Sequence, residues 1–213
     1  MSPDSKKHFV VAGIGTEIGK TFVSAILTEA LEADYWKPVQ AGNLDATDTD
    51  FIRQHVSNNV TACHPEGYRL IRPMSPHAAA AAEGIRIDLN KLSPPGTANP
   101  LVIELAGGLM VPLNDRQLNT DLLRIWNLPV SLVSQSYLGS INHTLLSAEA
   151  LKQLGVLVAG LIFNGEANPV TEGFILNYTG LPCLARIGHQ KEITKETVRQ
   201  LANALKPGLK FIL

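Results

Sequence analysis

The stretch "VVAGIGTEIGKTFVSAIL", residues 10–27, joins two apolar segments through a glycine-rich turn that ends in Gly19-Lys20-Thr21. That ending is typical of a phosphate-binding loop. In the common pattern four residues precede the Gly-Lys-Thr ending after the first glycine, but here five residues separate Gly13 from Gly19. The stretch therefore encodes either a phosphate loop with one extra residue or an ordinary tight turn.

The context of this turn favours a phosphate site. Its glycines allow the backbone N–H groups to face inward, where they form a nest for phosphate oxygens. A helix beginning at Lys20 would add the positive end of its dipole. Lys20 can reach the outer phosphates of a nucleotide, and Thr21 offers a hydroxyl to Mg²⁺. Because the turn follows an apolar strand and opens an apolar-periodic helix, we favour the phosphate loop.

Short apolar runs alternate with helical patterns along the rest of the chain. The expected strands are His8–Ala12, Tyr35–Val39, Leu101–Leu105, Val130–Ser134, Val156–Phe163 and Leu184–Ile187. The expected helices are Lys20–Ala33, Asp48–Val56, Thr120–Trp126, Ile141–Leu154, Val170–Tyr178 and Lys195–Leu205, with a shorter one in the alanine run 78–82. Fully apolar strands that alternate with helices predict a parallel sheet covered on both faces. We therefore expect one α/β domain over residues 1–213, with a doubly wound, mostly parallel sheet of the P-loop NTPase type.

The composition is that of a soluble, core-forming chain. Of 213 residues, 45% are hydrophobic and 17% charged, and the net charge of −1 gives no field that attracts nucleic acid or an anionic membrane. We therefore expect neither as a partner. The start "MSPDSKKHFVV" has no signal-peptide pattern. Cys63 and Cys183 lack metal-ligand spacing, which suits packing roles in a reducing cytoplasm.

Charged residues stand at the ends of two expected strands. In "YWKPVQAG", residues 35–42, Lys37 closes the second strand, and Pro38 fixes the turn that follows. In "VIELAGGLMVPL", residues 102–113, Glu104 ends an apolar strand, where a carboxylate is costly unless it is paired or faces a metal. A lone lysine is commonly a solvated surface charge. Ligands of such sheets bind beyond the carboxyl ends of the strands, however, so both residues are candidates for the site.

Three aspartates, Asp45, Asp48 and Asp50, lie in "DATDTDF" at the start of an expected helix. At least one of them should cap that helix. Thr21, one of these aspartates and Glu104 would form the all-oxygen set of ligands that Mg²⁺ prefers, completed by phosphates and water.

These segments together resemble the dethiobiotin synthetase family. The resemblance runs from residue 8 to about residue 190, and "GIGTEIGKT" resembles that family's variant loop, which has the same extra residue. The segments "KPVQAG", "MSPHAAA", "ELAGG", "LGSINHTLLS" and "GLIFNG" resemble its later motifs. The loop and the Glu-x-Ala-Gly-Gly segment alone would also admit amidotransferase and partition ATPases, but the other motifs favour the synthetase.

The resemblance implies an ATP-dependent ligase that uses Mg²⁺. In the implied reaction, 7,8-diaminononanoate, CO₂ and ATP give dethiobiotin, ADP and phosphate. One amine captures CO₂ as a carbamate, the carbamate oxygen attacks the γ-phosphate, and the second amine closes the ureido ring. The resemblance also implies a homodimer, in which residues 139–142 of the neighbouring chain hold the acid tail of the substrate.

The resemblance further implies roles for particular residues. The ATP-binding positions are Thr16, Glu17, Ile18, Gly19, Lys20, Thr21, Asp48, Glu104, Asn164 and Gly165. The metal ligands are Thr21, Asp48 and Glu104. The substrate-binding positions are Ala41, Gly139, Ser140, Asn142 and Phe174. The catalytic residues are Lys20 and Lys37, which would neutralise the γ-phosphate and carbamate oxygens as charge moves between them.

Some of these positions have plainer explanations. Asn164 resembles an adenine-reading asparagine, although Asn-Gly also suits an ordinary turn. Ser140 suits a helix cap equally well. Asp48 is chosen over Asp50 as the metal ligand because its spacing to Ser75 resembles that of the family.

Two positions depart from the family pattern. Leu105 replaces the first glycine of Glu-Gly-Ala-Gly-Gly, and we expect it to narrow the approach of the backbone to phosphate or substrate. Ala41 stands where the family often has a hydroxyl residue, so that side chain cannot hydrogen-bond to substrate.

A different class of function is a nucleotide-dependent switch, such as a partition-type ATPase. Such proteins usually carry a second lysine early in the loop, and many end in a basic amphipathic helix. No lysine lies between Gly13 and Lys20, and the end of the chain, "KPGLKFIL", is short and mixed. The sequence therefore favours the synthetase.

Overall fold

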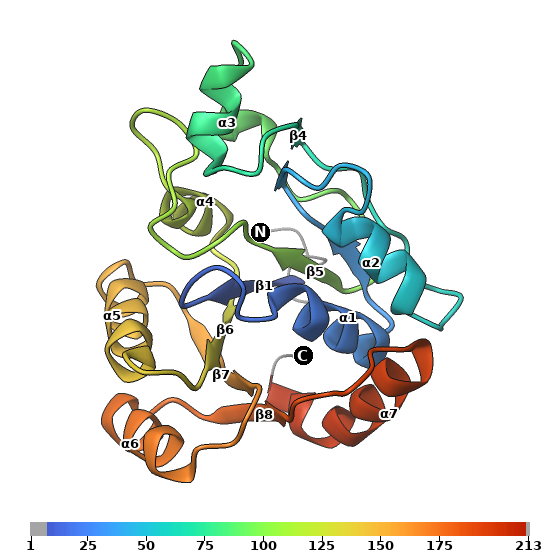
Figure 1. Ribbon diagram of the computed structural model, residues 1–213, viewed down its shortest axis with the longest axis vertical. Coiled ribbons are helices and arrows are strands. Elements are labelled where there is room, and N and C mark those ends of the chain that lie inside the picture. The colour runs from blue at the N-terminus through green and yellow to red at the C-terminus, as the bar shows by residue number, and fades with distance from the viewer. Residues whose placement is uncertain (1–7, 212–213) are drawn as a thin grey trace.

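A computed structural model describes residues 8–211, the last two of them by backbone alone. Expectations about the first seven residues and about Ile212 and Leu213 lie outside the described range. The chain folds around a six-stranded sheet with helices on both faces (Figure 1). No helix within residues 8–211 is long and apolar enough to cross a membrane.

The main sheet is parallel throughout, as the sequence predicts. Its strands are β1 (His8–Gly13), β2 (Asp34–Trp36), β5 (Leu101–Glu104), β6 (Val130–Gln135), β7 (Val158–Asn164) and β8 (Cys183–Ile187). Their order is β2-β5-β1-β6-β7-β8, and every neighbouring pair is parallel. From β1 the chain crosses to the edge strand β2 and returns to β5 beside β1, and it then continues on the other side of β1 through β6, β7 and β8. The predicted doubly wound architecture of the P-loop type is confirmed.

Two apolar cores form because both faces of this sheet are covered. Figure 1 shows α4 (Asn119–Trp126), α5 (Ser140–Gln153) and α6 (Pro169–Thr179) on one face, and α1 (Lys20–Leu31) and α7 (Lys195–Leu205) on the other. Successive residues of a strand point to opposite faces. In β1, accordingly, Val10 belongs to the α4–α6 core and Val11 to the α1–α7 core. This burial on both sides explains why the strands read as continuous apolar runs.

The remaining helices and the helix starts follow local chemistry. The short α3 (Pro76–Ala82) has proline in its first turn, where a missing N–H costs nothing. Thr47 caps α2 (Asp48–His55) and forms a capping box with Asp50. The predicted helices are all present, with ends that differ by one or two residues for most of them.

The predicted second strand, Tyr35–Val39, is wrong as a single element. It is broken at Lys37-Pro38 into β2 and β3 (Val39–Ala41). The second half leaves the main sheet and pairs in parallel with β4 (Tyr68–Leu70), which the sequence did not predict. Proline cannot donate to a strand ladder, and the Pro38 carbonyl instead accepts from the Tyr68 N–H at 3.1 Å. The three residues of β4 are too few to show a period in the sequence.

A buried carboxylate anchors the first half of this broken strand. Asp34 Oδ1 accepts from the Ala62 N–H and the Asn99 amide, at 2.9 and 3.0 Å. Asp34 Oδ2 accepts from the Thr97 hydroxyl at 2.6 Å and lies 2.9 Å from His64 Nε2. Asp34 thus ties two loops to the edge strand that leads to Lys37. Burial opposes ionisation, but these hydrogen bonds hold the pKa of Asp34 below its ordinary value.

Replacing Asp34 with asparagine should lower the free energy of unfolding by about 2 kcal/mol. In the parent the donors around Asp34 are shared between two carboxylate oxygens, whereas an amide has one acceptor oxygen. Urea unfolding at pH 7 measures the loss, and the exposed Asp45→Asn is the matched control. A carboxyl group with a depressed pKa stabilises the fold above the unfolded-state pKa and loses that contribution as the pH falls. The difference between parent and variant should therefore narrow below about pH 4. If the difference in free energy of unfolding stayed constant as the pH fell, the ionised Asp34 carboxylate would not be the stabilising group.

Candidate active site

An open cavity of about 710 Å³ lies where the expected phosphate loop faces the carboxyl ends of β1, β2 and β5. Its lining residues are Thr16, Glu17, Gly19, Lys20, Thr21, Lys37, Val39, Gln40, Ala41, Asn43, Asp48, Pro73, Met74, Ser75, Pro76, Glu104, Ala106, Gly107 and Val111. A larger groove of about 900 Å³ lies elsewhere, along α5 and α6, and lacks this gathering of charges. The smaller cavity is therefore the candidate active site.

The loop between β1 and α1 has the backbone shape of a phosphate cradle. Glu17 and Gly19 have φ angles of 58° and 79°, in the left-handed region, so the turn brings N–H groups to its inner side. A Cβ at Gly19 would lie 2.2 Å from Asn164 Nδ2, so the position requires glycine for space as well as for conformation. Helix α1 begins directly after it, at Lys20.

Lys20 folds back over the loop. Its Nζ donates to the carbonyl of Gly15 at 2.8 Å. Burial lowers the pKa of Lys20 to about 8; Glu104 and Asp48 oppose that shift, while Lys37 adds to it. A phosphate in the loop would offer this ammonium a full negative charge in place of a carbonyl.

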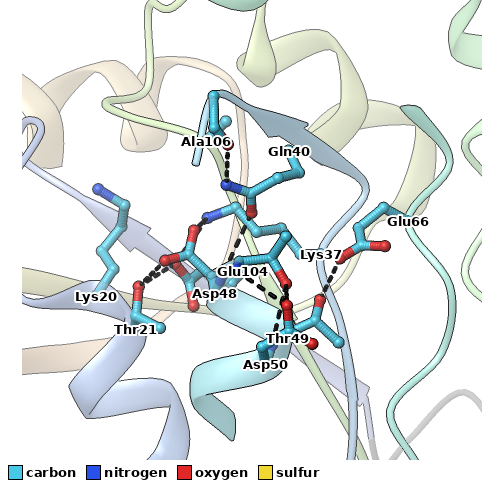
Figure 2. A network of polar contacts seen from close by, with 12 residues as sticks. Lys20, Thr21, Lys37, Gln40, Asp48, Thr49, Asp50, Glu66, Glu104 and Ala106 are labelled. Atoms are coloured by element: carbon cyan, nitrogen blue, oxygen red, sulfur yellow. Dashed lines mark hydrogen bonds and ion pairs between the residues drawn. The ribbon is translucent and has the colours of Figure 1, made fainter. Parts of the chain in front are cut away.

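A cluster of polar contacts joins four separate elements beside the loop (Figure 2). Lys37 Nζ donates to Glu104 Oε1 at 3.0 Å and forms an ion pair with Asp48. Thr21 Oγ1 lies 2.8 Å from Asp48 Oδ1 and 3.0 Å from Glu104 Oε1, and its single proton can serve one of them at a time. The start of α1, the end of β2, the start of α2 and the end of β5 therefore converge on one point.

The charges in this cluster stabilise one another against burial. Lys37 is 5% exposed and Glu104 is 1% exposed. Burial alone would lower the pKa of Lys37, but the charges of Glu104 and Asp48 raise it above its ordinary value. Burial likewise opposes ionisation of Asp48, yet Lys37 and the Thr21 hydroxyl hold the pKa of Asp48 down. Lys37 and Asp48 are therefore both charged at neutral pH.

The aspartates of "DATDTDF" have separate positions. Asp48 is the first residue of α2 and faces the cavity. The side chain of Asp50 is used in the capping box, where Oδ2 accepts from the Thr47 N–H and hydroxyl at 3.1 and 2.7 Å. Asp45 is exposed in the preceding loop. Thr49 ties α2 to the loop before β4 through a 2.6 Å hydrogen bond to Glu66, which fixes the helix that carries Asp48.

Thr21, Asp48 and Glu104 form an oxygen-only set that fits a hard divalent cation. In residues 8–211 no group of three or more His, Cys, Asp and Glu side chains is placed to hold a metal ion. The protein supplies only two carboxylates and a hydroxyl, so Mg²⁺ would need phosphate oxygens and water as well. That is the usual way in which Mg²⁺ is held with a nucleotide.

Some residues expected in the site lie outside this cavity. Asn164 is at the end of β7, where its Nδ2 donates to the Ile18 carbonyl at 2.9 Å and so braces the phosphate loop. Gly165 follows with a φ of 97°. Ala41 lines the cavity.

Gly139, Ser140, Asn142 and Phe174 are not among the residues that line the cavity within one chain. Gly139, not Ser140, is the N-cap residue of α5. Ser140 is 2% exposed, and its hydroxyl accepts from the Tyr137 N–H at 3.3 Å. Asn142 is exposed on the first turn of α5, and Phe174 is half-exposed on α6, stacked on Tyr178.

Leu105 does not narrow the cavity, contrary to expectation. It follows Glu104 and therefore points to the opposite face of the sheet. There it is 1% exposed and belongs to the α4–α6 core, and it is not among the lining residues. Leucine fills apolar space behind the site at this position.

Sequence reasoning missed two residues that contact the cluster. Gln40 Oε1 accepts from the Asp48 N–H at 3.4 Å, and Gln40 Nε2 donates to the Gly42 carbonyl at 2.9 Å. The hydroxyl of Tyr35 donates to Glu104 Oε2 at 2.9 Å. The period of two in an extended chain puts Tyr35 on the same side as Lys37, and this signal was present in the sequence.

A parallel α/β sheet with a glycine-rich loop, a following lysine and threonine, and strand-end carboxylates defines a P-loop nucleotide-binding protein. The family model described as "AAA domain" matches residues 7–197. The chain is 50% identical over 198 residues to the ATP-dependent dethiobiotin synthetase BioD of Cytophaga hutchinsonii, covering 92% of this chain and 95% of that one. It is 45% identical to the synthetase of Christiangramia forsetii, covering 95% and 98%. The chain belongs to the dethiobiotin synthetase family, which confirms the resemblance seen in the sequence and its class, an ATP-dependent synthetase.

The fold is shared more widely than the family. A ParA family ATPase from Chlorobium tepidum superposes with a TM-score of 0.56 at 13% identity, covering 96% of this chain and 92% of that chain. At this identity the likeness concerns the fold alone. A ParA family ATPase therefore shares the architecture, while the sequence relatives are synthetases.

Proposed function

We propose that residues 1–213 act as one unit that converts 7,8-diaminononanoate, CO₂ and ATP into dethiobiotin, ADP and phosphate. Family membership supports this proposal, and one feature of the site carries it: Lys20 and Lys37 reach a single cavity from different elements, beside Thr21, Asp48 and Glu104. Two cations above a phosphate loop suit a reaction in which negative charge passes between two anions.

The proposed chemistry needs positioning and charge stabilisation, and no covalent link to the protein. One amine of the substrate adds to CO₂ and loses a proton, which gives a carbamate. The carbamate oxygen attacks the γ-phosphorus and ADP leaves, so a carbamic-phosphoric anhydride forms. The second amine then attacks the carbonyl carbon and expels phosphate as the ring closes. Lys37 would stabilise the carbamate and γ-phosphate oxygens, and Lys20 the outer phosphates.

The loop backbone from Thr16 to Lys20 would hold the phosphates through its N–H groups. Asn164 and Gly165 would lie along the base, since Asn164 already touches the loop. Thr21, Asp48 and Glu104 would hold Mg²⁺, which neutralises charge on the outer phosphates when it is bound. We also place the enzyme in the cytoplasm, because Cys63 and Cys183 are both free thiols.

Phosphate release with and without the diamine and bicarbonate tests this function. The proposed reaction requires strong dependence on both, together with formation of the cyclic urea product detected by mass spectrometry. Hydrolysis that depends on neither, but is stimulated by a protein or lipid, would instead identify a switch ATPase of the partition type.

Lys37→Ala should lower kcat at least about 100-fold while the affinity for ATP stays within a few-fold, because Lys37 faces charge that develops during the reaction. Lys37→Gln should lower kcat to a similar extent, since a neutral amide cannot replace the positive charge of the lysine. Nucleotide titration of each variant shows that it is folded, and the exposed Lys195→Ala is the matched control. Turnover near that of the parent would rule out the role of Lys37.

Asp48→Asn should raise the Mg²⁺ concentration for half-maximal activity about tenfold, because a charged ligand is lost. Asp50→Asn should change it less than about twofold, because Asp50 serves the capping box and an amide oxygen can still accept there. Steady-state rates across a Mg²⁺ titration compare the two variants. A larger rise in the half-maximal Mg²⁺ concentration for Asp50→Asn than for Asp48→Asn would make Asp50 the metal ligand instead.

We further propose that the enzyme is a homodimer in which Gly139, Ser140, Asn142 and Phe174 meet the substrate held by the other chain. Within one chain these residues do not line the cavity around Lys20 and Lys37. They lie on or beside α5 and α6. These helices and the loop before α5 carry several exposed apolar side chains: Leu138, Leu146, Val170, Phe174 and Tyr178. An apolar surface of this kind suits burial against a second copy. The start of α5 would offer N–H groups to a carboxylate.

Asn142→Ala should then raise the KM for the diamine about tenfold and leave the KM for ATP nearly unchanged, because one hydrogen bond to a carboxylate is lost. Asn90→Ala, an exposed asparagine on a different face, is the control. Sedimentation of the parent gives its oligomeric state. An active monomer, or normal diamine binding by the variant, would contradict the shared site.

A further inference from the structure

The hydroxyl of Tyr35 reaches the cluster of charges from inside the core. Its oxygen donates to Glu104 Oε2 at 2.9 Å, and both side chains are almost fully buried, at 0% and 1% exposed. Tyr35 is not among the residues that line the cavity. It therefore contacts Glu104 from behind, on the side away from the space where a ligand would bind.

The backbone of Tyr35 is held on both sides. In the main sheet Tyr35 is in register with Val102 of β5, two residues before Glu104. On the other side the Tyr35 N–H donates to the Ala62 carbonyl at 2.9 Å, and the Tyr35 carbonyl accepts from the His64 N–H at 2.8 Å. The ring packs in the α1–α7 core. A phenol fixed in this way has little freedom to follow a moving carboxylate.

The two oxygens of Glu104 have different surroundings as a result. Oε1 faces Thr21 and Lys37, at 3.0 Å from each. Oε2 faces Tyr35. A buried carboxylate oxygen without a donor is costly, so Glu104 is most stable with Oε2 on the phenol and Oε1 toward the cavity. Burial and the negative charges of Glu104 and Asp48 raise the pKa of Tyr35 well above its ordinary value, which keeps its proton available for donation.

We propose that Tyr35 is a positioning residue, which fixes the rotation of Glu104 so that Oε1 alone is presented to Thr21, Lys37 and a divalent cation. This inference rests on the proposed role of Glu104 in holding the metal. Without the phenol, Glu104 can turn Oε2 toward Lys37, and the carboxylate then pairs more fully with the lysine. That change weakens metal binding by Glu104, and it also leaves the Lys37 ammonium group less available to a substrate oxygen.

Tyr35→Phe tests the inference, because it removes one oxygen and keeps the ring. Tyr68→Phe is the matched control: the Tyr68 hydroxyl also takes part in a hydrogen bond, accepting from the Asp88 N–H at 3.0 Å, but it does not touch the cluster. The direct readout is the affinity for Mn²⁺ in the presence of ADP, measured by electron paramagnetic resonance. The second readout is the Mg²⁺ dependence of phosphate release, with the KM for the diamine measured separately.

Tyr35→Phe should weaken Mn²⁺ binding about tenfold and raise the half-saturating Mg²⁺ concentration by a similar factor, as loss of a group that orients a metal ligand commonly does. The KM for the diamine should stay within about twofold, and Tyr68→Phe should leave both metal readouts unchanged. In a Glu104→Gln background, Tyr35→Phe should have no further effect on Mn²⁺ affinity, because the oxygen that it orients is no longer a charged ligand.

Unchanged Mn²⁺ affinity in Tyr35→Phe would overturn the inference, as would an equal loss in the Glu104→Gln background. A purely structural role of Tyr35 would lower the thermal stability of Tyr35→Phe and leave both metal readouts unchanged, which would also overturn the inference. These outcomes are separate from failure of the proposed function. If the parent protein binds Mn²⁺ with ADP but releases no phosphate with the diamine, the proposed synthetase reaction is ruled out. The Mn²⁺ comparison would still decide the role of Tyr35.

Discussion

The constraint on which this structure depends is the burial of Lys37 and Glu104, together with the partly buried Asp48, at the carboxyl end of a parallel sheet. Lys37, Asp48 and Glu104 could not lie this close to the core singly, because an unpaired buried charge is strongly destabilising. Each is stabilised by the others, and Thr21 and Tyr35 complete the hydrogen bonds. Since these groups come from separate elements, α1, α2, β2 and β5 must be placed together for any of them to be stable.

This cluster is also what a nucleotide would rearrange. Lys20 is paired with a loop carbonyl and Lys37 with two carboxylates, so both ammonium groups have partners that a more negative ligand can replace. The break at Pro38 matters here, because it ends β2 at Trp36 and leaves Lys37 at the point where the chain turns from the main sheet to β3. The architecture is shared with a ParA family ATPase, so the fold alone does not distinguish a dethiobiotin synthetase from such an ATPase. The strand-end lysine and the carboxylates are what we assign to the synthetase reaction.

Much of the site could be predicted because its residues are marked by local chemistry. A carboxylate ending an apolar strand, a lysine before a proline, and Gly-Lys-Thr opening a helix each conflict with a simple packing role. Leu105 shows the limit of this reasoning. Compared with a family motif it suggested an obstructed site, but alternation along β5 turns its side chain into the opposite core. A motif position carries no information about the face of the sheet until the register is known.

The sequence by itself determined the glycine-rich loop before α1, the parallel sheet with its two covered faces, the helices and several of the residues that meet in the cavity. These follow from periodicity and from chemistry within a few residues. Only the tertiary structure decided that β3 pairs with β4, that Asn164 braces the loop at Ile18, and that Tyr35 holds one oxygen of Glu104. Such contacts join residues far apart in the chain. They depend on strand register and on the direction of each side chain, which only the folded arrangement of strands and helices sets.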